Sequence, residues 1–182
     1  MTSLCCGTWV CKFFNTVRTP NQLNDLVESL SITLRRSTSL NELVFYTMAT
    51  DGGYSSLQEL VIDIGWEYYD VEPLSLDGSE YLSSFINQRK NLRTVSLQMT
   101  GDELVPIVET LSRTKVQSLQ IDFCRTPSQQ NGFRQLGTAL ERCTCITQLH
   151  LEFPSYVDHV EFFQILLVES IPKIMTRTWS ET

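Results

Sequence analysis

A pattern of five apolar residues recurs along the chain and restricts the folds that the chain can adopt. Its spacing is Leu-x3-Leu-x5-Leu-x2-Leu-x-Leu, with Ile, Val or Phe in place of some leucines. Three copies keep these gaps, and a fourth is one residue shorter between its second and third positions. The copies are Leu30, Leu34, Leu40, Leu43, Phe45; Leu82, Ile86, Leu92, Val95, Leu97; Ile107, Leu111, Val116, Leu119, Ile121; and Leu136, Leu140, Ile146, Leu149, Leu151. Four copies of a five-point pattern indicate an internal repeat.

Each copy joins the spacing of a helix to the spacing of a strand. Apolar residues four apart lie on one face of a helix, and apolar residues two apart lie on one face of a strand. Alternating helices and short strands are typical of parallel sheets. We therefore predict neighbouring, mainly parallel strands in sequence order, preceded by helices such as the one expected over 21–34. The predicted strand centres are residues 43–45, 60–62, 95–97, 119–121 and 149–151.

Two further segments match the strand half of the pattern less well. The strand expected over 57–62 has no helix of its own, because only 17 residues separate Leu40 from Leu57. The Asp-Gly-Gly sequence at 51–53 is compatible with a tight connection between parallel strands or with a hairpin turn. Residues 6–11 are expected to form an irregular first strand.

A doubly wound α/β sheet is the alternative architecture. No Gly-rich phosphate-binding loop follows any predicted strand, and the strands are short. A doubly wound fold does not require its strands to resemble one another, whereas a solenoid does. The repeat therefore favours a solenoid.

The strand segments LRTVSLQM (92–99), VQSLQIDFC (116–124) and ITQLHLEF (146–153) resemble the LxxLxL strand of leucine-rich repeats. Cys124 stands where that motif closes with Asn or Cys. The helical connections are similar to those of the ribonuclease-inhibitor-like subclass. This resemblance implies a short right-handed α/β solenoid, with parallel strands on the concave face and helices on the convex face. The closing position departs from the motif in the other repeats, which carry Met48, Gly65, Thr100 and Pro154.

The repeats organise the chain into one domain. Clear repeats cover about residues 21–170 of a single domain that spans 1–182. Segments 1–20 and 160–182 are expected to cap the stack or to dock on another protein, because the ends of a solenoid need covering. The apolar helix expected at 160–174 is the stronger docking candidate of the two.

Composition narrows the functional classes. The 14 Lys and Arg against 21 Asp and Glu give a net charge of −7, without the basic footprint typical of nucleic-acid binders. No apolar run approaches the roughly 20 residues that span a membrane. The first residues lack the basic and apolar regions of a secretory signal. Six cysteines without disulfide-scaffold spacing favour an intracellular, cytoplasmic location.

The predicted strands present one set of side chains away from the core. Positions three, five and seven of each LxxLxL segment should face outward, because successive strand side chains alternate between the two faces. These positions are Glu42, Val44, Tyr46; Glu59, Val61, Asp63; Thr94, Ser96, Gln98; Ser118, Gln120, Asp122; and Gln148, His150, Glu152. Five of them are acidic and none is Lys or Arg. The pattern predicts either a surface for a protein partner with a basic patch or ordinary solvated surface.

The partner-binding candidates come from this face and from one loop. The loop at 65–78 is the longest insertion between repeats and is rich in aromatic residues, which make effective interface anchors. The candidates are Glu42, Tyr46, Glu59, Asp63, Gln98, Asp122, His150 and Glu152 on the face, and Trp66, Tyr68 and Tyr69 in the loop. The loop rings could instead fold back over the edge of the repeat stack.

Metal, cofactor and catalytic sites are not expected. A single residue separates Cys143 from Cys145, whereas structural zinc sites space paired cysteines by two to four. With these cysteines, His150 and His159 form the chain's main Cys/His cluster. Neither histidine lies in a recognisable catalytic motif.

The sequence thus predicts a non-catalytic protein–protein interaction module or scaffold, in the setting of a larger complex. One alternative is the recognition part of a ubiquitin-ligase substrate receptor, although no F-box-like segment precedes the repeats. An alternative from another class is a small α/β enzyme whose active site follows no motif recognised here.

Overall fold

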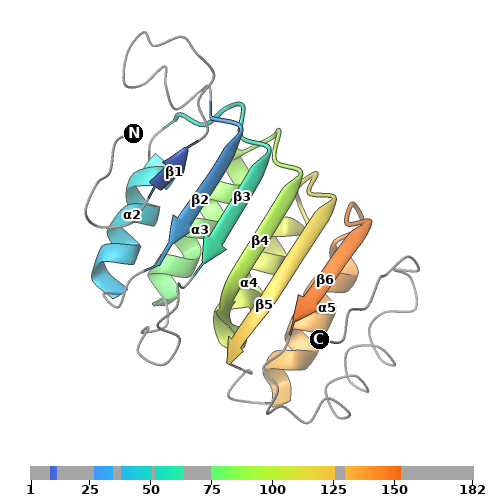
Figure 1. The fold of residues 1–182 in the computed structure, drawn as a ribbon. Helices are drawn as coiled ribbons and strands as arrows, with labels where there is room; N and C mark the ends of the chain where they lie inside the picture. Colours follow the sequence, from blue (N-terminus) through green and yellow to red (C-terminus); the bar gives the residue numbers. More distant parts are fainter. Residues whose placement is uncertain are drawn as a thin grey trace, which may run out of the picture.

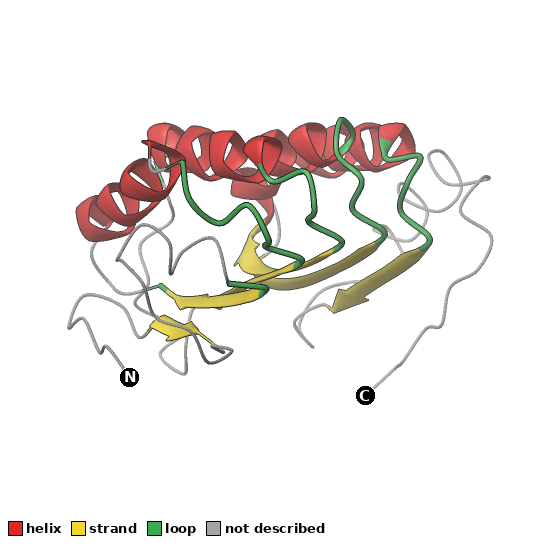
Figure 2. Ribbon diagram, turned by 90° about the horizontal axis from the view of Figure 1, so that it is seen from above, coloured by secondary structure: helices red, strands yellow, loops and turns green. Residues whose placement is uncertain are grey.

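The structure is a computed structural model that describes residues 9–11, 27–34, 38–50, 52–63, 75–125 and 130–152. It shows an α/β fold of two layers, with helices over one face of a sheet (Figures 1 and 2). The strands are β1 (Trp9–Cys11), β2 (Ser29–Thr33), β3 (Glu59–Asp63), β4 (Thr94–Thr100), β5 (Ser118–Arg125) and β6 (Gln148–Glu152). The helices are α2 (Thr38–Thr50), α3 (Leu76–Gln88), α4 (Gly101–Leu111) and α5 (Gln130–Arg142).

The described strands form one sheet in sequence order. Strands β2 to β6 are parallel to their neighbours, and one helix connects each consecutive pair. Strand β1 pairs antiparallel with β2. The prediction of adjacent parallel strands at 60–62, 95–97, 119–121 and 149–151 is confirmed. An interleaved strand order, as in a doubly wound sheet, is not observed in this part of the chain.

The same hydrogen-bond pattern occurs just before every parallel pair. The carbonyl oxygen of Glu28 accepts hydrogen bonds from the backbone N–H groups of Gln58 and Glu59, at 2.8 and 3.0 Å. The carbonyl oxygens of Gln58, Arg93 and Gln117 each accept the equivalent pair from the next repeat, again at 2.8 and 3.0 Å. A carbonyl oxygen has two lone pairs, so one group can hold both donors. The repeat in the sequence is therefore also a repeat in backbone geometry.

Three apolar rows run across the sheet beneath the helices. In the first row every residue precedes its strand, and all five are buried: Val27, Leu57, Leu92, Val116 and Ile146. The second row aligns Leu30, Leu60, Val95, Leu119 and Leu149, and the third aligns Ile32, Ile62, Leu97, Ile121 and Leu151. Each row buries apolar surface against its neighbours, and this burial is the main stabilising contribution to such a stack.

The helices pack side by side and close the core from one direction. Their apolar stripes supply buried side chains such as Phe45 on α2, Phe85 on α3, Ile107 on α4 and Leu136 on α5. Helix α3 begins at a capped end, because the Ser75 hydroxyl accepts a hydrogen bond from the N–H of Gly78 at 3.1 Å. The three predicted helices at 82–86, 104–111 and 133–140 are confirmed.

Arg89 is a buried cation that ties two helices together. Its guanidinium carbon lies 4.4 Å from the ring centroid of Phe85, and its Nη2 donates to the carbonyl oxygen of Met48 at 3.2 Å. That carbonyl belongs to the last turn of α2, where a positive charge complements the negative helix end. Arg89 therefore joins the end of α3 to the end of α2.

The prediction for the first repeat is wrong. Residues 29–33 form strand β2 where a helix was expected, and residues 43–45 lie inside helix α2 where a strand was expected. The five-point pattern from Leu30 to Phe45 matched in the wrong phase. Side chains of β2 alternate between half-buried and buried, whereas Phe45 and Met48 on α2 are buried with helical spacing. Leu43 was expected inside and is 58% exposed.

The corrected phase also explains the short step at 40–57. The LxxLxL segment of the first repeat is VESLSI at 27–32, so 30 residues separate Leu30 from Leu60 and leave room for α2. Both connections considered for residues 51–53 are therefore wrong, because the described part of this segment leads from a helix to a strand. Residues 9–11 form a strand as expected, but its antiparallel pairing excludes them from the parallel repeat.

Truncation of Leu119 tests the core. Leu119 is 1% exposed in the central apolar row, so Leu119→Ala should lower the free energy of unfolding by about 2–5 kcal/mol through lost burial and a cavity. Urea unfolding followed by circular dichroism measures this change. The neighbouring Gln120 is exposed, and Gln120→Ala should change stability by about 0.5 kcal/mol or less. Equal effects of the two substitutions would contradict the assigned faces of β5.

Candidate functional site

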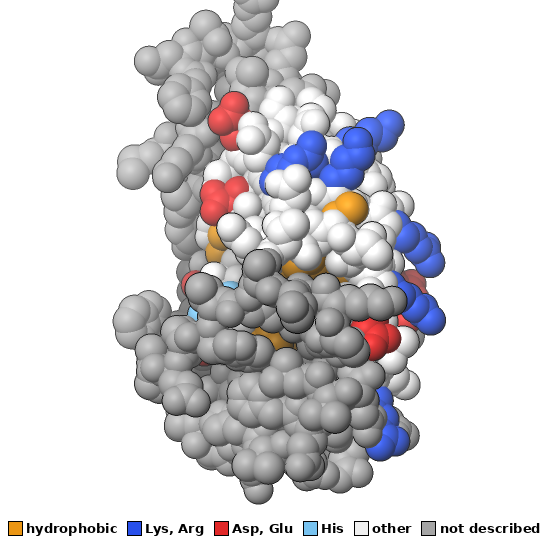
Figure 3. Space-filling model, turned by 90° about the vertical axis from the view of Figure 1, so that its right-hand side faces the viewer, with side chains coloured by type: hydrophobic (Ala, Val, Ile, Leu, Met, Phe, Trp, Pro, Cys, Tyr) orange, Lys and Arg blue, Asp and Glu red, His pale blue; other side chains and the backbone are white. Residues whose placement is uncertain are grey.

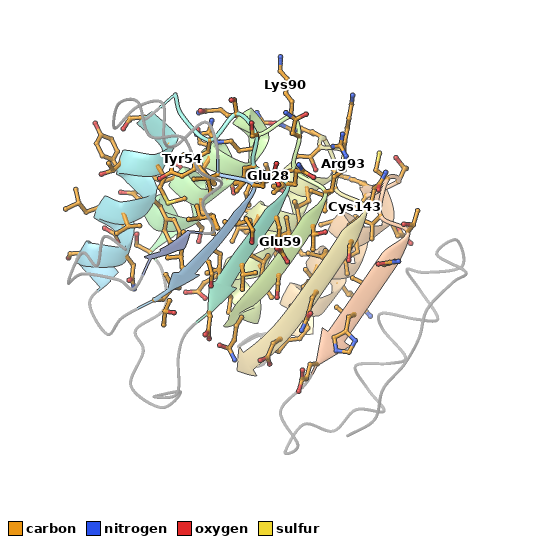
Figure 4. All side chains as sticks on the ribbon, turned by 45° about the horizontal axis from the view of Figure 1, so that its top comes forward. Glu28, Tyr54, Glu59, Lys90, Arg93 and Cys143 are labelled. Carbon is orange, nitrogen blue, oxygen red and sulfur yellow. The ribbon has the colours of Figure 1, made fainter. Side chains whose placement is uncertain are left out.

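The face of the sheet opposite the helices, here called the outer face, is the candidate site. It is formed by the strand side chains that alternate with the buried rows (Figure 4). Strand pairing aligns Ser29, Glu59, Thr94, Ser118 and Gln148 in one row, and Ser31, Val61, Ser96, Gln120 and His150 in the next. Thr33 pairs with Asp63 in the last row, and Gln98, Asp122 and Glu152 pair in succession.

The structure brings six of the predicted site residues together on this face. They are Glu59, Asp63, Gln98, Asp122, His150 and Glu152. Glu42 and Tyr46 do not belong to the group, because both lie on α2 in the helix layer. Tyr46 instead contacts Tyr81 of α3 edge-to-face, with ring centroids 5.3 Å apart. Trp66, Tyr68 and Tyr69 lie outside the described residues, as do His159 and the helix expected at 160–174.

The sequence reasoning missed the outer-face residues of the first strand. These are Ser29, Ser31 and Thr33, all half-buried. The signal was present in the sequence, since Val27, Leu30 and Ile32 follow the LxxLxL spacing. The overlapping helical stripe from Leu23 to Leu34 concealed it. With this correction, four of the fifteen outer-face positions are acidic and none is Lys or Arg.

The carboxylates gather toward the end of the face at which the strands terminate. Gln98 on β4 donates a hydrogen bond from Nε2 to Oδ2 of Asp122 on β5 at 2.7 Å. Burial raises the pKa of the Asp122 carboxyl above its ordinary value, and the nearby charges of Glu152 and Asp63 raise it further. The hydrogen bond from Gln98 and the proximity of His150 act in the opposite direction. This end of the face is thus a concentration of negative charge, which we call the acidic end.

Glu59 lies at the other end of the same face. Its Oε2 accepts a hydrogen bond from the hydroxyl of Ser29 on the adjacent strand, at 2.7 Å. Glu59 is exposed, so its carboxylate keeps further acceptor capacity toward solvent or a partner. In Figure 3, Asp and Glu side chains lie at the left of the described surface, and Lys and Arg side chains follow its upper right-hand margin.

The two described cysteines of the Cys/His cluster occupy different environments. Cys143 is buried, and its thiol lies 3.5 Å from the carbonyl oxygen of Val108 and 3.4 Å from that of Ala139. Burial raises the pKa of Cys143 to about 12, so its thiol is protonated and unreactive at neutral pH. Cys145 is exposed. Among the described residues, no group of three or more His, Cys, Asp and Glu is arranged to hold a metal ion.

A depression lies between α3 and α4 in the helix layer. Its volume is about 260 Å³, and its lining residues are Glu80, Ser83, Pro106, Glu109, Thr110 and Arg113. Ligand pockets typically measure about 300–1,000 Å³ and are mostly apolar, so this depression is small and polar by comparison. It belongs to the helix layer, whereas the carboxylates of the outer face belong to the sheet.

Comparison with known proteins adds no family assignment. No model of a known protein family matches the chain, and no curated protein matches it in sequence. None of the described helices is both long enough and apolar enough to cross a membrane.

Asp122 gives the fold a defined pH dependence. Because its pKa is raised in the folded state, its contribution favours the fold most below the ordinary carboxyl pKa and declines as pH rises through the folded value. Asp122→Asn should therefore raise the melting temperature at pH 7, by on the order of 1 °C, and this gain should shrink as pH falls below that ordinary value. Thermal unfolding by circular dichroism at pH 3 to 8 measures it.

A carboxyl on α5 provides the control for that measurement. Glu141 is exposed on a helix, so Glu141→Gln should show no matching pH-dependent gain. A lower melting temperature of the Asp122→Asn protein at pH 7 would contradict the raised pKa.

Proposed function

We propose that the chain is a non-catalytic protein-binding module whose outer face binds a basic patch on a partner protein. The observation that carries the proposal is the charge of this face. It holds Glu59, Asp63, Asp122 and Glu152 and no Lys or Arg. An interface with one sign of charge accelerates encounter with an oppositely charged partner and repels partners of like charge.

The proposed architecture is the right-handed leucine-rich-repeat solenoid of the ribonuclease-inhibitor-like subclass, with the outer face as its concave side. Three features support it: the sequential parallel strand order, the five LxxLxL segments and the recurring carbonyl pattern before each strand. A rigid sheet of this kind presents its side chains in fixed positions. Little conformational entropy is then lost when a partner binds.

The dimensions of the face suit one partner. Five strands at about 4.8 Å spacing give a width of about 20 Å. A standard interface uses about 800 Å² of each protein, so binding would engage most of the face and some adjoining residues. We place this function inside the cell as part of a larger complex, because Cys143 and Cys145 are both free thiols and an exposed free thiol suits a reducing compartment.

Charge reversal on the outer face tests the proposal. The Glu59→Lys, Asp63→Lys, Asp122→Lys protein changes the charge of the face by six units. Surface substitutions typically change stability by about 0.5 kcal/mol each, so circular dichroism should show a folded protein. Partners captured from cell extract with the wild-type protein are identified by mass spectrometry, purified and measured by surface plasmon resonance. The association rate constant of a basic partner should fall about tenfold or more with the variant.

The matched control reverses three charges in the helix layer. Glu80, Glu109 and Glu141 are exposed on α3, α4 and α5, and their replacement by Lys produces the same change in net charge. This control should keep the wild-type association rate within about twofold at physiological salt. If both variants slow association equally, net charge explains the effect and the outer face does not. If neither slows it, the acidic face is ordinary solvated surface.

A further inference from the structure

The opposite edge of the sheet carries charge of the opposite sign. The described connections that lead from a helix to the next strand are residues 52–58, 89–93, 112–117 and 143–147. These connections contain no Asp or Glu, whereas they contain Arg89, Lys90, Arg93, Arg113 and Lys115. Arg142, the last residue of α5, lies at the same edge. Figure 4 shows Lys90 and Arg93 at this edge.

Five of these cations are available to solvent, and we call them the basic rim: Lys90, Arg93, Arg113, Lys115 and Arg142. All are exposed except Arg93, which is half-buried. The Arg93 Nη1 donates to the carbonyl oxygens of Lys90 and Leu92, at 3.3 and 3.1 Å. Within the described residues, no carboxylate forms an ion pair with a member of the rim. The positive charge is therefore not neutralised locally.

The ends of the helices explain only part of this charge. Helices α3, α4 and α5 all end at this edge, and their negative ends favour nearby cations such as Lys90 and Arg142. That effect is confined to the last turn of a helix. Arg93 lies five residues beyond the end of α3, and Lys115 lies four residues beyond the end of α4. Charge at these positions contributes little to helix stability and is free to serve recognition.

We propose that the basic rim binds an acidic segment of a partner protein, as a second interface distinct from the outer face. The two surfaces carry opposite charge, and they lie at opposite ends of the strands apart from Glu59. A partner surface that is attracted to the acidic end is repelled by the rim. The charge arrangement therefore suits two different binding surfaces, on one partner or on two.

The backbone at the rim argues against a bound phosphate group. Compact anions are usually held by free backbone N–H groups at a helix N-terminus or in a nest. Here the helices present carbonyl ends, and the N–H groups of Arg93, Thr94, Gln117 and Ser118 already donate to the preceding repeat. Recognition is left to flexible side-chain tips, which suit the spaced carboxylates of an extended peptide.

Nucleic acid is also a poorer fit than an acidic peptide. The chain has a net charge of −7, and the exposed carboxylates Glu28 and Glu59 lie close to the rim. A long polyanion that crosses the rim would meet these charges. Single strands are usually held by stacking on aromatic side chains as well. The described connections contain one aromatic residue, Tyr54, which is 9% exposed and packs against Phe85.

The probe for this proposal is a fluorescein-labelled peptide of eight glutamates, measured by fluorescence anisotropy with the full chain. Wild-type protein should bind it at about 50 mM salt, and binding should weaken as salt rises. The Lys90→Gln, Arg113→Gln, Lys115→Gln protein should bind at least about tenfold more weakly. Circular dichroism establishes that each variant is folded.

A matched pair on one helix separates the rim from general charge effects. Arg142 is at the rim end of α5, and Arg134 is exposed two turns earlier on the same helix. Arg142→Gln should weaken peptide binding about two- to fivefold, while Arg134→Gln should leave it within about twofold. Equal losses from the two substitutions would overturn the proposal.

Two further outcomes would also overturn it. One is the absence of peptide binding at protein concentrations up to about 1 mM. The other is tighter binding of a twenty-nucleotide single-stranded DNA than of the peptide, which would indicate a nucleic-acid surface. The Glu59→Lys, Asp63→Lys, Asp122→Lys protein should still bind the peptide, so failure of the outer-face proposal is distinguishable from failure of this one.

Discussion

The paired hydrogen bonds at the start of each strand hold the repeats in one register, and the charge pattern of the surface depends on that register. One carbonyl oxygen of each repeat accepts two N–H groups of the next, from Glu28 through Gln117. A slip of a single residue would turn every strand over, because side chains alternate between faces. The apolar rows would then face solvent and the carboxylates would be buried. Burial of three aligned rows makes such a slip unfavourable.

The same register accounts for the acidic end of the outer face. Asp122 and Glu152 pair directly across β5 and β6, and Gln98 pairs with Asp122 from the other side. Like charges on adjacent strands repel one another. The Gln98 side chain offsets part of this repulsion by donating to Asp122. The fold therefore tolerates a charge arrangement that contributes nothing to its own stability, as expected of a surface that serves binding.

Charge along the strands is distributed by the direction of the chain. In a parallel sheet with helical connections, every helix ends at the edge where the next strand begins, so the negative helix ends collect at one edge. Cations at that edge, such as Lys90 and Arg142, are favoured by the helices. The rim continues past this region to Arg93 and Lys115, and there the helix ends no longer account for it. One edge of the molecule thus differs in charge from the outer face near the other.

The amino-acid sequence by itself determined the repeating unit, the parallel order of four strands and the outward position of residues such as Asp63 and His150. These features depend on local spacing, which a strand or a helix expresses within a few residues. The first repeat could not be assigned in this way. Residues 23–34 satisfy a helical stripe and an LxxLxL strand at once, and local spacing does not distinguish the two. Pairing with β3 decides between them, because Leu30 aligns with Leu60 only if residues 29–33 form a strand.

The tertiary structure also decided which charges act together. Asp63, Asp122 and Glu152 are separated by 59 and 30 residues in the chain, yet their charges interact on three strands of one face. The cations of the rim come from connections that the sequence shows only as isolated pairs and single residues. Such groupings depend on which strands are neighbours and in which direction they run. That information lies in long-range backbone pairing, which the spacing of residues within one repeat does not contain.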